Sequence, residues 1–151
     1  YAKSLKLMAQ ELSTDLNVLE IGTGTGLISF AIADKVKRIK AIDNAPEMIK
    51  IANAKLKDSK FDNIEFQLNA ATEIKQQDKA FDVIIASNIL HLLPHPEKAL
   101  QEILRLVTPL FTASEILCLY RRRNFCLFSL DLFFPFLRLS IIKVTSTSYL
   151  V

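Results

Sequence analysis

The chain has 151 residues, of which 50% are apolar and 23% are charged, and its formal net charge is +3. This composition excludes a disordered chain, which needs low hydrophobicity and high net charge, and no internal repeat is visible. The basic excess is too small to predict nucleic-acid binding. We therefore expect one globular domain over residues 1–151.

The two cysteines, Cys118 and Cys126, form neither a metal-ligand spacing nor a disulfide framework. We therefore expect no metal site and a location in the reducing cytoplasm. The first residue is Tyr1 rather than Met, which suggests that the numbering starts inside a longer gene product. No charged and then apolar leader is visible at this start.

Strand and helix patterns alternate along residues 5–107. Helices are predicted where apolar residues recur at helical spacing, and strands where short apolar or alternating runs occur. Pro46 and Pro96 stand at the starts of helices, and Pro109 follows the end of the last one. In chain order, the predicted elements are a helix over 5–12, a strand over 17–21, a helix over 27–36, a strand over 39–43, a helix from 46, strands over 63–68 and 82–87, and a helix over 97–107.

This alternation predicts an α/β fold with a mostly parallel sheet and helices on both faces. Ligands of such sheets bind at the carboxyl ends of the strands. The residues that follow each predicted strand are therefore the first candidates for a functional site.

All three glycines of the chain lie within five residues, in the run Glu-Ile-Gly-Thr-Gly-Thr-Gly that ends at Gly26. Glycine suits a turn with unusual dihedral angles and lets a ligand approach the backbone, and the next helix would begin with free N–H groups. The dinucleotide fingerprint G-x-G-x-x-G is absent. The carboxylate of Glu20, two residues before Gly22, favours a cationic ligand over a phosphate. We interpret the run as a binding loop rather than a purely structural turn.

Asp43 ends the second predicted strand, 17 residues after Gly26. An acid about 20 residues beyond a glycine loop can accept hydrogen bonds from both hydroxyls of a ribose. Taken alone, an Asp before a helix is equally well explained as a capping residue. Its place beside the glycine loop favours the ribose role.

These segments resemble the class I S-adenosylmethionine-dependent methyltransferases, in particular the small-molecule branch that includes ubiquinone- and menaquinone-type enzymes. The resemblance covers about residues 1–109 and rests on four ordered motifs, at 18–26, 41–49, 81–91 and 99–105. It implies a Rossmann-like fold with a cofactor-binding half over 1–109 and S-adenosylmethionine as the cofactor. It does not identify the methyl acceptor.

The resemblance also implies a set of cofactor-binding residues. They are Glu20, Gly22, Thr23, Gly24, Gly26, Asp43, Asn44, Met48, Asn69, Ala70, Ala71, Ser87 and Asn88. Glu20 and the backbone of residues 22–24 are expected to face the methionine part, and Asp43 to hold the ribose hydroxyls.

The remaining members of this set are expected around the adenosine and the methyl group. Asn44 and Met48 should lie beside the adenosine, residues 69–71 should line the adenine, and residues 87–88 should lie near the amino-acid end and the methyl group. The family usually has Gly-Asp-Ala where this chain has Asn-Ala-Ala, so Ala70 lacks the customary acceptor for the adenine amino group. One such hydrogen bond contributes about 0.5–1.5 kcal/mol, so we expect weakened rather than abolished binding.

The C-terminal segment, residues 110–151, diverges from the family pattern. The family usually continues Lys-Pro-Gly-Gly into a fifth strand, whereas residues 108–111 read Thr-Pro-Leu-Phe. A fifth strand is expected at 110–114 or 116–120, and the C-terminal half of the sheet is abbreviated, diverged or altered by a reading-frame change. Residues 125–142 are almost continuously apolar but carry charges, so a buried or partner-facing helix is favoured over a membrane contact.

The leading hypothesis is a methyltransferase that uses S-adenosylmethionine and a small or lipid-like acceptor. A base is needed only if the acceptor must lose a proton; His91 is the candidate, although a histidine packed into a loop is the preferred interpretation. The alternative hypothesis is a non-catalytic or truncated relative that acts as a binding or interaction module, which Ala70 and the short C-terminal part favour. A nicotinamide-dependent dehydrogenase is disfavoured by Glu20 and by the glycine spacing.

Overall fold

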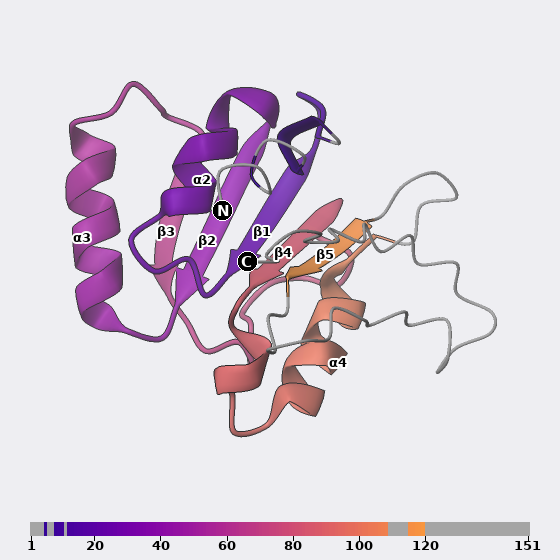
Figure 1. Ribbon diagram of the computed structural model, residues 1–151. Coiled ribbons are helices and arrows are strands. Elements are labelled where there is room, and N and C mark those ends of the chain that lie inside the picture. The colour runs from indigo at the N-terminus through magenta and orange to yellow at the C-terminus, as the bar shows by residue number, and fades with distance from the viewer. Residues whose placement is uncertain (1–4, 6–7, 11, 109–114, 120–151) are drawn as a thin grey trace, which may run out of the picture.

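The structure is a computed structural model that describes residues 5, 8–10, 12–108 and 115–119. In this part of the chain five strands form one sheet in the order β3-β2-β1-β4-β5, and each neighbouring pair is parallel (Figure 1). The strands are β1 (Asn17–Ile21), β2 (Arg38–Asp43), β3 (Ile64–Leu68), β4 (Val83–Ser87) and β5 (Glu115–Leu119). The predicted α/β fold with a parallel sheet is confirmed.

Helices cover both faces of this sheet. Figure 1 shows α2 (Leu27–Ile32) and α3 (Pro46–Lys57) on one face and α4 (Pro96–Leu106) on the other. Pro46 and Pro96 occupy the first helical turns, as predicted, where the missing N–H of proline costs nothing. Residues 5 and 8–10 are helical, within the helix predicted over 5–12.

Two predicted elements differ in extent. The helix predicted over 27–36 ends at Ile32 and continues as the short 3₁₀ helix η1 (Ala33–Lys35). The Asn63 side-chain amide donates to the carbonyls of Ala33 (2.7 Å) and Val36 (3.1 Å), and these bonds satisfy carbonyls at the end of the helix. For the fifth strand, β5 agrees with the second predicted position to within one residue.

Successive side chains of β1 point to opposite faces of the sheet, and each face carries its own apolar cluster. Val18 packs with residues of α2 and α3, whereas Leu19 and Ile21 pack with α4. On the α4 side, Ile103 is 1% exposed, and burial of such a side chain contributes roughly 1.5–3 kcal/mol. Both clusters hold the sheet rigidly from the two sides, so the ends of its strands have fixed positions.

The parallel register brings the carboxyl ends of four strands to one edge. Gly22 follows β1, Asp43 ends β2, Asn69 follows β3 and Ser87 ends β4. The predicted site residues therefore converge on this edge, although they lie up to 65 positions apart in the sequence.

Candidate functional site

A small hollow opens at the carboxyl edge of β1, β2 and β3. Its volume is about 240 Å³, including the open mouth. It is lined by Ile21, Gly22, Ile42, Asp43, Asn44, Asn69, Ala71, Ile89 and Leu93. Five of the residues expected to bind a ligand therefore meet here: Gly22, Asp43, Asn44, Asn69 and Ala71.

The glycine loop has the backbone that its sequence predicts. Gly22, Gly24 and Gly26 have φ angles of +73°, +55° and +84°, which side chains other than glycine rarely adopt. The N–H groups of Gly22 and Thr23 both donate to the carbonyl of Ile42, at 2.9 and 3.0 Å. The loop is thus tied by its backbone to the end of β2.

The three glycines have different surroundings. A Cβ atom on Gly22 would lie 2.8 Å from Cγ1 of Ile89, and one on Gly26 would lie 2.7 Å from the Phe66 ring. Apart from Gly24 itself and its two chain neighbours, no atom of the described residues lies within 4 Å of a Cβ placed on Gly24. Open space therefore lies over Gly24, whereas Gly26 serves the packing between α2 and β3.

Asp43 joins β2 to the glycine loop. Its Oδ2 accepts a hydrogen bond from the backbone N–H of Gly24 (2.7 Å), and its Oδ1 accepts one from the N–H of Ala45 (2.9 Å). Bonds of this kind to a charged acceptor are stronger than neutral ones. A carboxylate offers about four lone-pair positions, so Asp43 can still accept hydrogen bonds from a ligand in the hollow that it lines.

Glu20 lies beneath the loop, and its side chain is 1% exposed. Its Oε2 accepts hydrogen bonds from the Thr23 hydroxyl (2.9 Å), the Ser29 N–H (3.1 Å) and the Ser29 hydroxyl. Burial raises the pKa of Glu20 to about 7, against the opposing effect of these hydrogen bonds. The structure therefore places Glu20 as a support of the loop and the start of α2, outside the lining of the hollow.

Other members of the predicted set lie near the hollow without lining it. Ser87 ends β4, and its buried hydroxyl has no hydrogen-bond partner among the described residues. Asn88 follows with a φ of +56°. Met48 is 38% exposed on the first part of α3, and Ala70 is exposed between Asn69 and Ala71. The contacts of all these residues with a ligand stay predictions.

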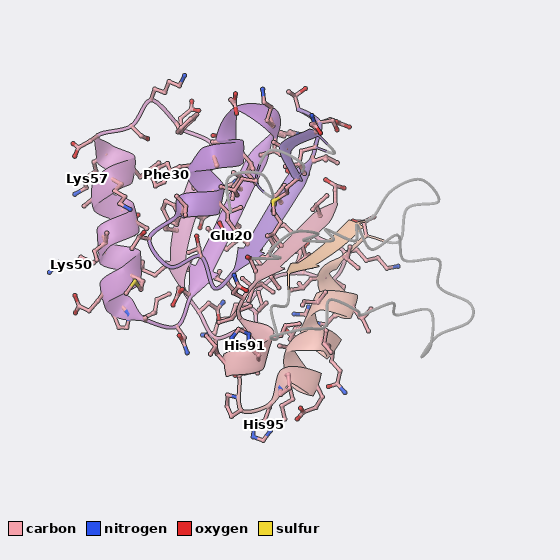
Figure 2. The ribbon with its side chains drawn as sticks, viewed as in Figure 1. Glu20, Phe30, Lys50, Lys57, His91 and His95 are labelled. Carbon is pink, nitrogen blue, oxygen red and sulfur yellow. The ribbon has the colours of Figure 1, made fainter. Side chains whose placement is uncertain are left out.

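The two histidines lie in different surroundings. Figure 2 shows His91 in the short 3₁₀ helix η2 (Leu90–Leu92), near the carboxyl edge of the sheet, and His95 at the outer end of the following loop. His95 Nδ1 lies 3.2 Å from Glu97 Oε1 at the surface. His91 is exposed in η2 rather than packed into a loop, and its role as a base stays a prediction.

Sequence reasoning missed several residues of this site. Ile89 and Leu93 line the hollow as apolar side chains after β4, and no motif distinguishes them from core residues. Ser29 was missed because nothing in the sequence shows that its side chain turns back to Glu20, nine residues earlier.

Two features of the described residues bear on other kinds of site. No group of three or more potential metal ligands occurs among them. None of the helices in this part of the chain combines the length and the apolar character of a membrane span. The apolar segment over 125–142 and its expected helix lie outside the described residues.

A parallel sheet in this strand order, with a glycine loop after β1 and an acid at the end of β2, defines a Rossmann-like nucleotide-cofactor domain. Residues 12–114 match the family model of the methyltransferase domain. The chain belongs to this methyltransferase domain family, and the resemblance found in the sequence is confirmed.

Named relatives agree with this membership. The chain is 32% identical over 111 residues to a demethylmenaquinone methyltransferase of Lactococcus lactis, covering 72% of this chain and 43% of that protein. It is 31% identical over 93 residues to a ubiquinone biosynthesis O-methyltransferase of Xylella fastidiosa, covering 61% and 37%. It also resembles the crystal structure of a SAM-dependent methyltransferase from Aquifex aeolicus, with a TM-score of 0.61, 28% identity and coverage of 69% and 57%. The chain spans less than half the length of the two relatives compared by sequence.

Proposed function

We propose that this chain binds S-adenosylmethionine at the carboxyl edge of the sheet and transfers its methyl group to a small, lipid-like acceptor. The proposal rests on the position and the bonding of Asp43. Its carboxylate is bonded to the Gly24 N–H, lines the hollow, and keeps lone pairs for the hydroxyls of a ribose. The quinone-type names of the sequence relatives support the lipid-like acceptor.

The residues present fit this cofactor. The open space over Gly24 leaves room for a ligand against the backbone. The buried Ser87 hydroxyl, which has no hydrogen-bond partner within the described part of the chain, would gain one from a polar group of the cofactor. Asn69 and Ala71 would lie beside the adenine, where Ala70 offers no carboxylate to its amino group. We place the cofactor-binding half in residues 1–109 and the protein in the cytoplasm as parts of the same proposal.

The chemistry asks little of the side chains. Bound S-adenosylmethionine supplies a methyl group on a sulfonium, whose sulfur leaves readily as a neutral thioether when the methyl group is transferred. The residues of the edge orient the reactants and exclude water, and these effects supply much of the rate of such a reaction. His91 would accept a proton from an acceptor that must lose one.

Calorimetric titration with S-adenosylhomocysteine tests the proposal. We expect saturable binding by the wild-type chain and a loss of about 100-fold or more in Asp43→Ala, because each hydrogen bond to a charged group contributes about 1.5–3 kcal/mol. Asp43→Asn, which keeps one oxygen acceptor, should lose less. The exposed Asp62 provides the control, and Asp62→Ala should bind as the wild type does.

The same titration separates the competing functions. Absence of binding at millimolar ligand would contradict the proposal and favour the non-catalytic module. Tighter binding of NAD than of S-adenosylhomocysteine would instead indicate a dehydrogenase.

A further inference from the structure

The adenine side of the hollow is formed by a segment without regular structure. Residues 69–80 connect β3 to β4 and contain neither helix nor strand. Two of them, Asn69 and Ala71, line the hollow. Because no helix or strand ladder holds this segment, other contacts must fix its position.

Backbone hydrogen bonds hold its two ends, from the N–H of Asn69 to the carbonyl of Asp43 (2.9 Å) and from the N–H of Lys79 to the carbonyl of Arg105 (3.0 Å). Its middle is held by two side chains of α4. The Arg105 guanidinium donates to the carbonyls of Ile74 (2.9 Å) and Gln76 (2.9 Å) and to the carboxylate of Asp78 (2.7 Å). Glu102 Oε2 accepts the N–H of Ile74 at 2.8 Å. The two α4 side chains thus bind both backbone groups of Ile74, which lies nearly 30 positions earlier in the chain.

Glu102 and Arg105 also hold each other. Arg105 Nε lies 3.0 Å from Glu102 Oε1, and one terminal nitrogen lies 2.8 Å from Oε2. This two-point geometry requires the planar fork of arginine. The hydrogen bonds from Arg105 lower the pKa of Glu102 despite its partial burial, so the pair is ionised at neutral pH.

The anchored segment is continuous with the wall of the hollow. Ile74 is 3% exposed and belongs to the same apolar cluster as Ala71 and the α4 residues Ile103 and Leu106. In the turn that leads from Ala71 to Ile74, the N–H of Glu73 donates to the carbonyl of Ala70 at 3.4 Å. A shift of Ile74 would therefore move Ala71, three residues away on the adenine side.

We propose that Glu102 and Arg105 are positioning residues, which fix the Asn69–Ala71 wall for the adenine without touching the cofactor. This inference rests on the proposed cofactor function. It predicts that binding of the adenosine part depends on two side chains of α4 that do not line the hollow.

The test compares two ligands in three variants. S-adenosylhomocysteine and 5′-methylthioadenosine share the adenosine, and only the first carries the amino-acid part. We expect Arg105→Gln to weaken binding of both ligands by the same factor, about tenfold, at a temperature where circular dichroism shows the protein folded. Glu102→Gln should have a smaller effect, because its amide oxygen can still accept the N–H of Ile74. Arg105→Lys should recover only part of the loss, since an ammonium cannot form the fork.

A second ion pair provides matched controls. Arg38 Nη2 of β2 lies 3.3 Å from Glu65 Oε2 of β3 at the surface of the sheet. Arg38→Gln and Glu65→Gln make the same changes of charge away from the 69–80 segment, so both should bind each ligand within twofold of the wild type.

Hydrogen exchange gives an independent measurement. In Arg105→Gln the amide of Ile74 should exchange faster, while the amides of the glycine loop should not change. A folded variant with lower thermal stability but wild-type affinity for both ligands would overturn the positioning role. If the wild-type chain binds neither ligand, the proposed function fails, and this inference fails with it.

Discussion

The two sides of the hollow are built in different ways. On the glycine-loop side, the side-chain hydrogen bonds join residues within 20 positions of each other: Gly24 is hydrogen-bonded to Asp43, 19 residues away, and Glu20 to Ser29, nine residues away. On the side of Asn69 and Ala71, where we propose that the adenine binds, the connecting segment is bonded to Arg105 of α4, 27 to 31 residues later in the chain. The first side is encoded as a local motif, and the second depends on the packing of α4.

The packing of the glycine loop offers the largest expected effect on stability. Gly26→Ala would combine a left-handed φ of +84° with a Cβ 2.7 Å from the Phe66 ring. Gly24→Ala would also have a left-handed φ, of +55°, but its Cβ would point into open space. We expect Gly26→Ala to lower the free energy of unfolding by about 2–4 kcal/mol and Gly24→Ala by about 1–2 kcal/mol. Urea denaturation measures both values. Equal losses would show that the aromatic contact does not constrain the loop.

The acids on the two sides should give stability profiles of opposite sign. Burial raises the pKa of Glu20 from 4.5 to about 7, so between these pH values the folded state binds more protons than the unfolded state. Its contribution to stability is therefore fully present below pH 4.5 and is lost as the pH rises through 7, by roughly 3 kcal/mol. Hydrogen bonds from Arg105 lower the pKa of Glu102, so its contribution is present above pH 4.5 and is lost in acid.

Unfolding free energies of the wild type, Glu20→Gln and Glu102→Gln between pH 3 and pH 8 measure these two profiles. As the pH rises through 7, the free energy of unfolding of the wild type should fall relative to that of Glu20→Gln. The difference between the wild type and Glu102→Gln should shrink towards acid pH. A flat profile for Glu20→Gln relative to the wild type would mean that the buried carboxyl does not titrate in this range.

The contrast also explains what the sequence could predict. The glycine run, Asp43 and the alternation of strands and helices are local signals, and they predicted the order of the elements and the loop at the end of β1 correctly. The orientation of Glu20 was not predictable, because a carboxylate two residues before a glycine can turn towards a ligand or towards the next helix. Only the fold shows that the hydroxyl of Ser29 donates a hydrogen bond to this carboxylate.

The side of the hollow formed by Asn69 and Ala71 has fewer local signals in the sequence. Glu102 and Arg105 lie in the motif over 99–105, but their spacing of three residues predicts only a pair on one helix face. Their bonds to Ile74 and Gln76 depend on how α4 packs against the sheet. Such non-local contacts have no signature in a single sequence.

The smallest effect concerns the contact between the glycine loop and Ile89, which follows β4. A Cβ on Gly22 would lie 2.8 Å from Cγ1 and 2.9 Å from Cβ of Ile89. Gly22→Ala alone should therefore be destabilised by both the φ of +73° and this overlap. Adding Ile89→Ala removes Cγ1 but leaves the Cβ of residue 89 in place, so relief is partial. A double-mutant cycle should give a coupling of about 1 kcal/mol. Strictly additive losses would show that Ile89 moves aside freely, and that the β4 side of the hollow adapts to the loop instead of constraining it.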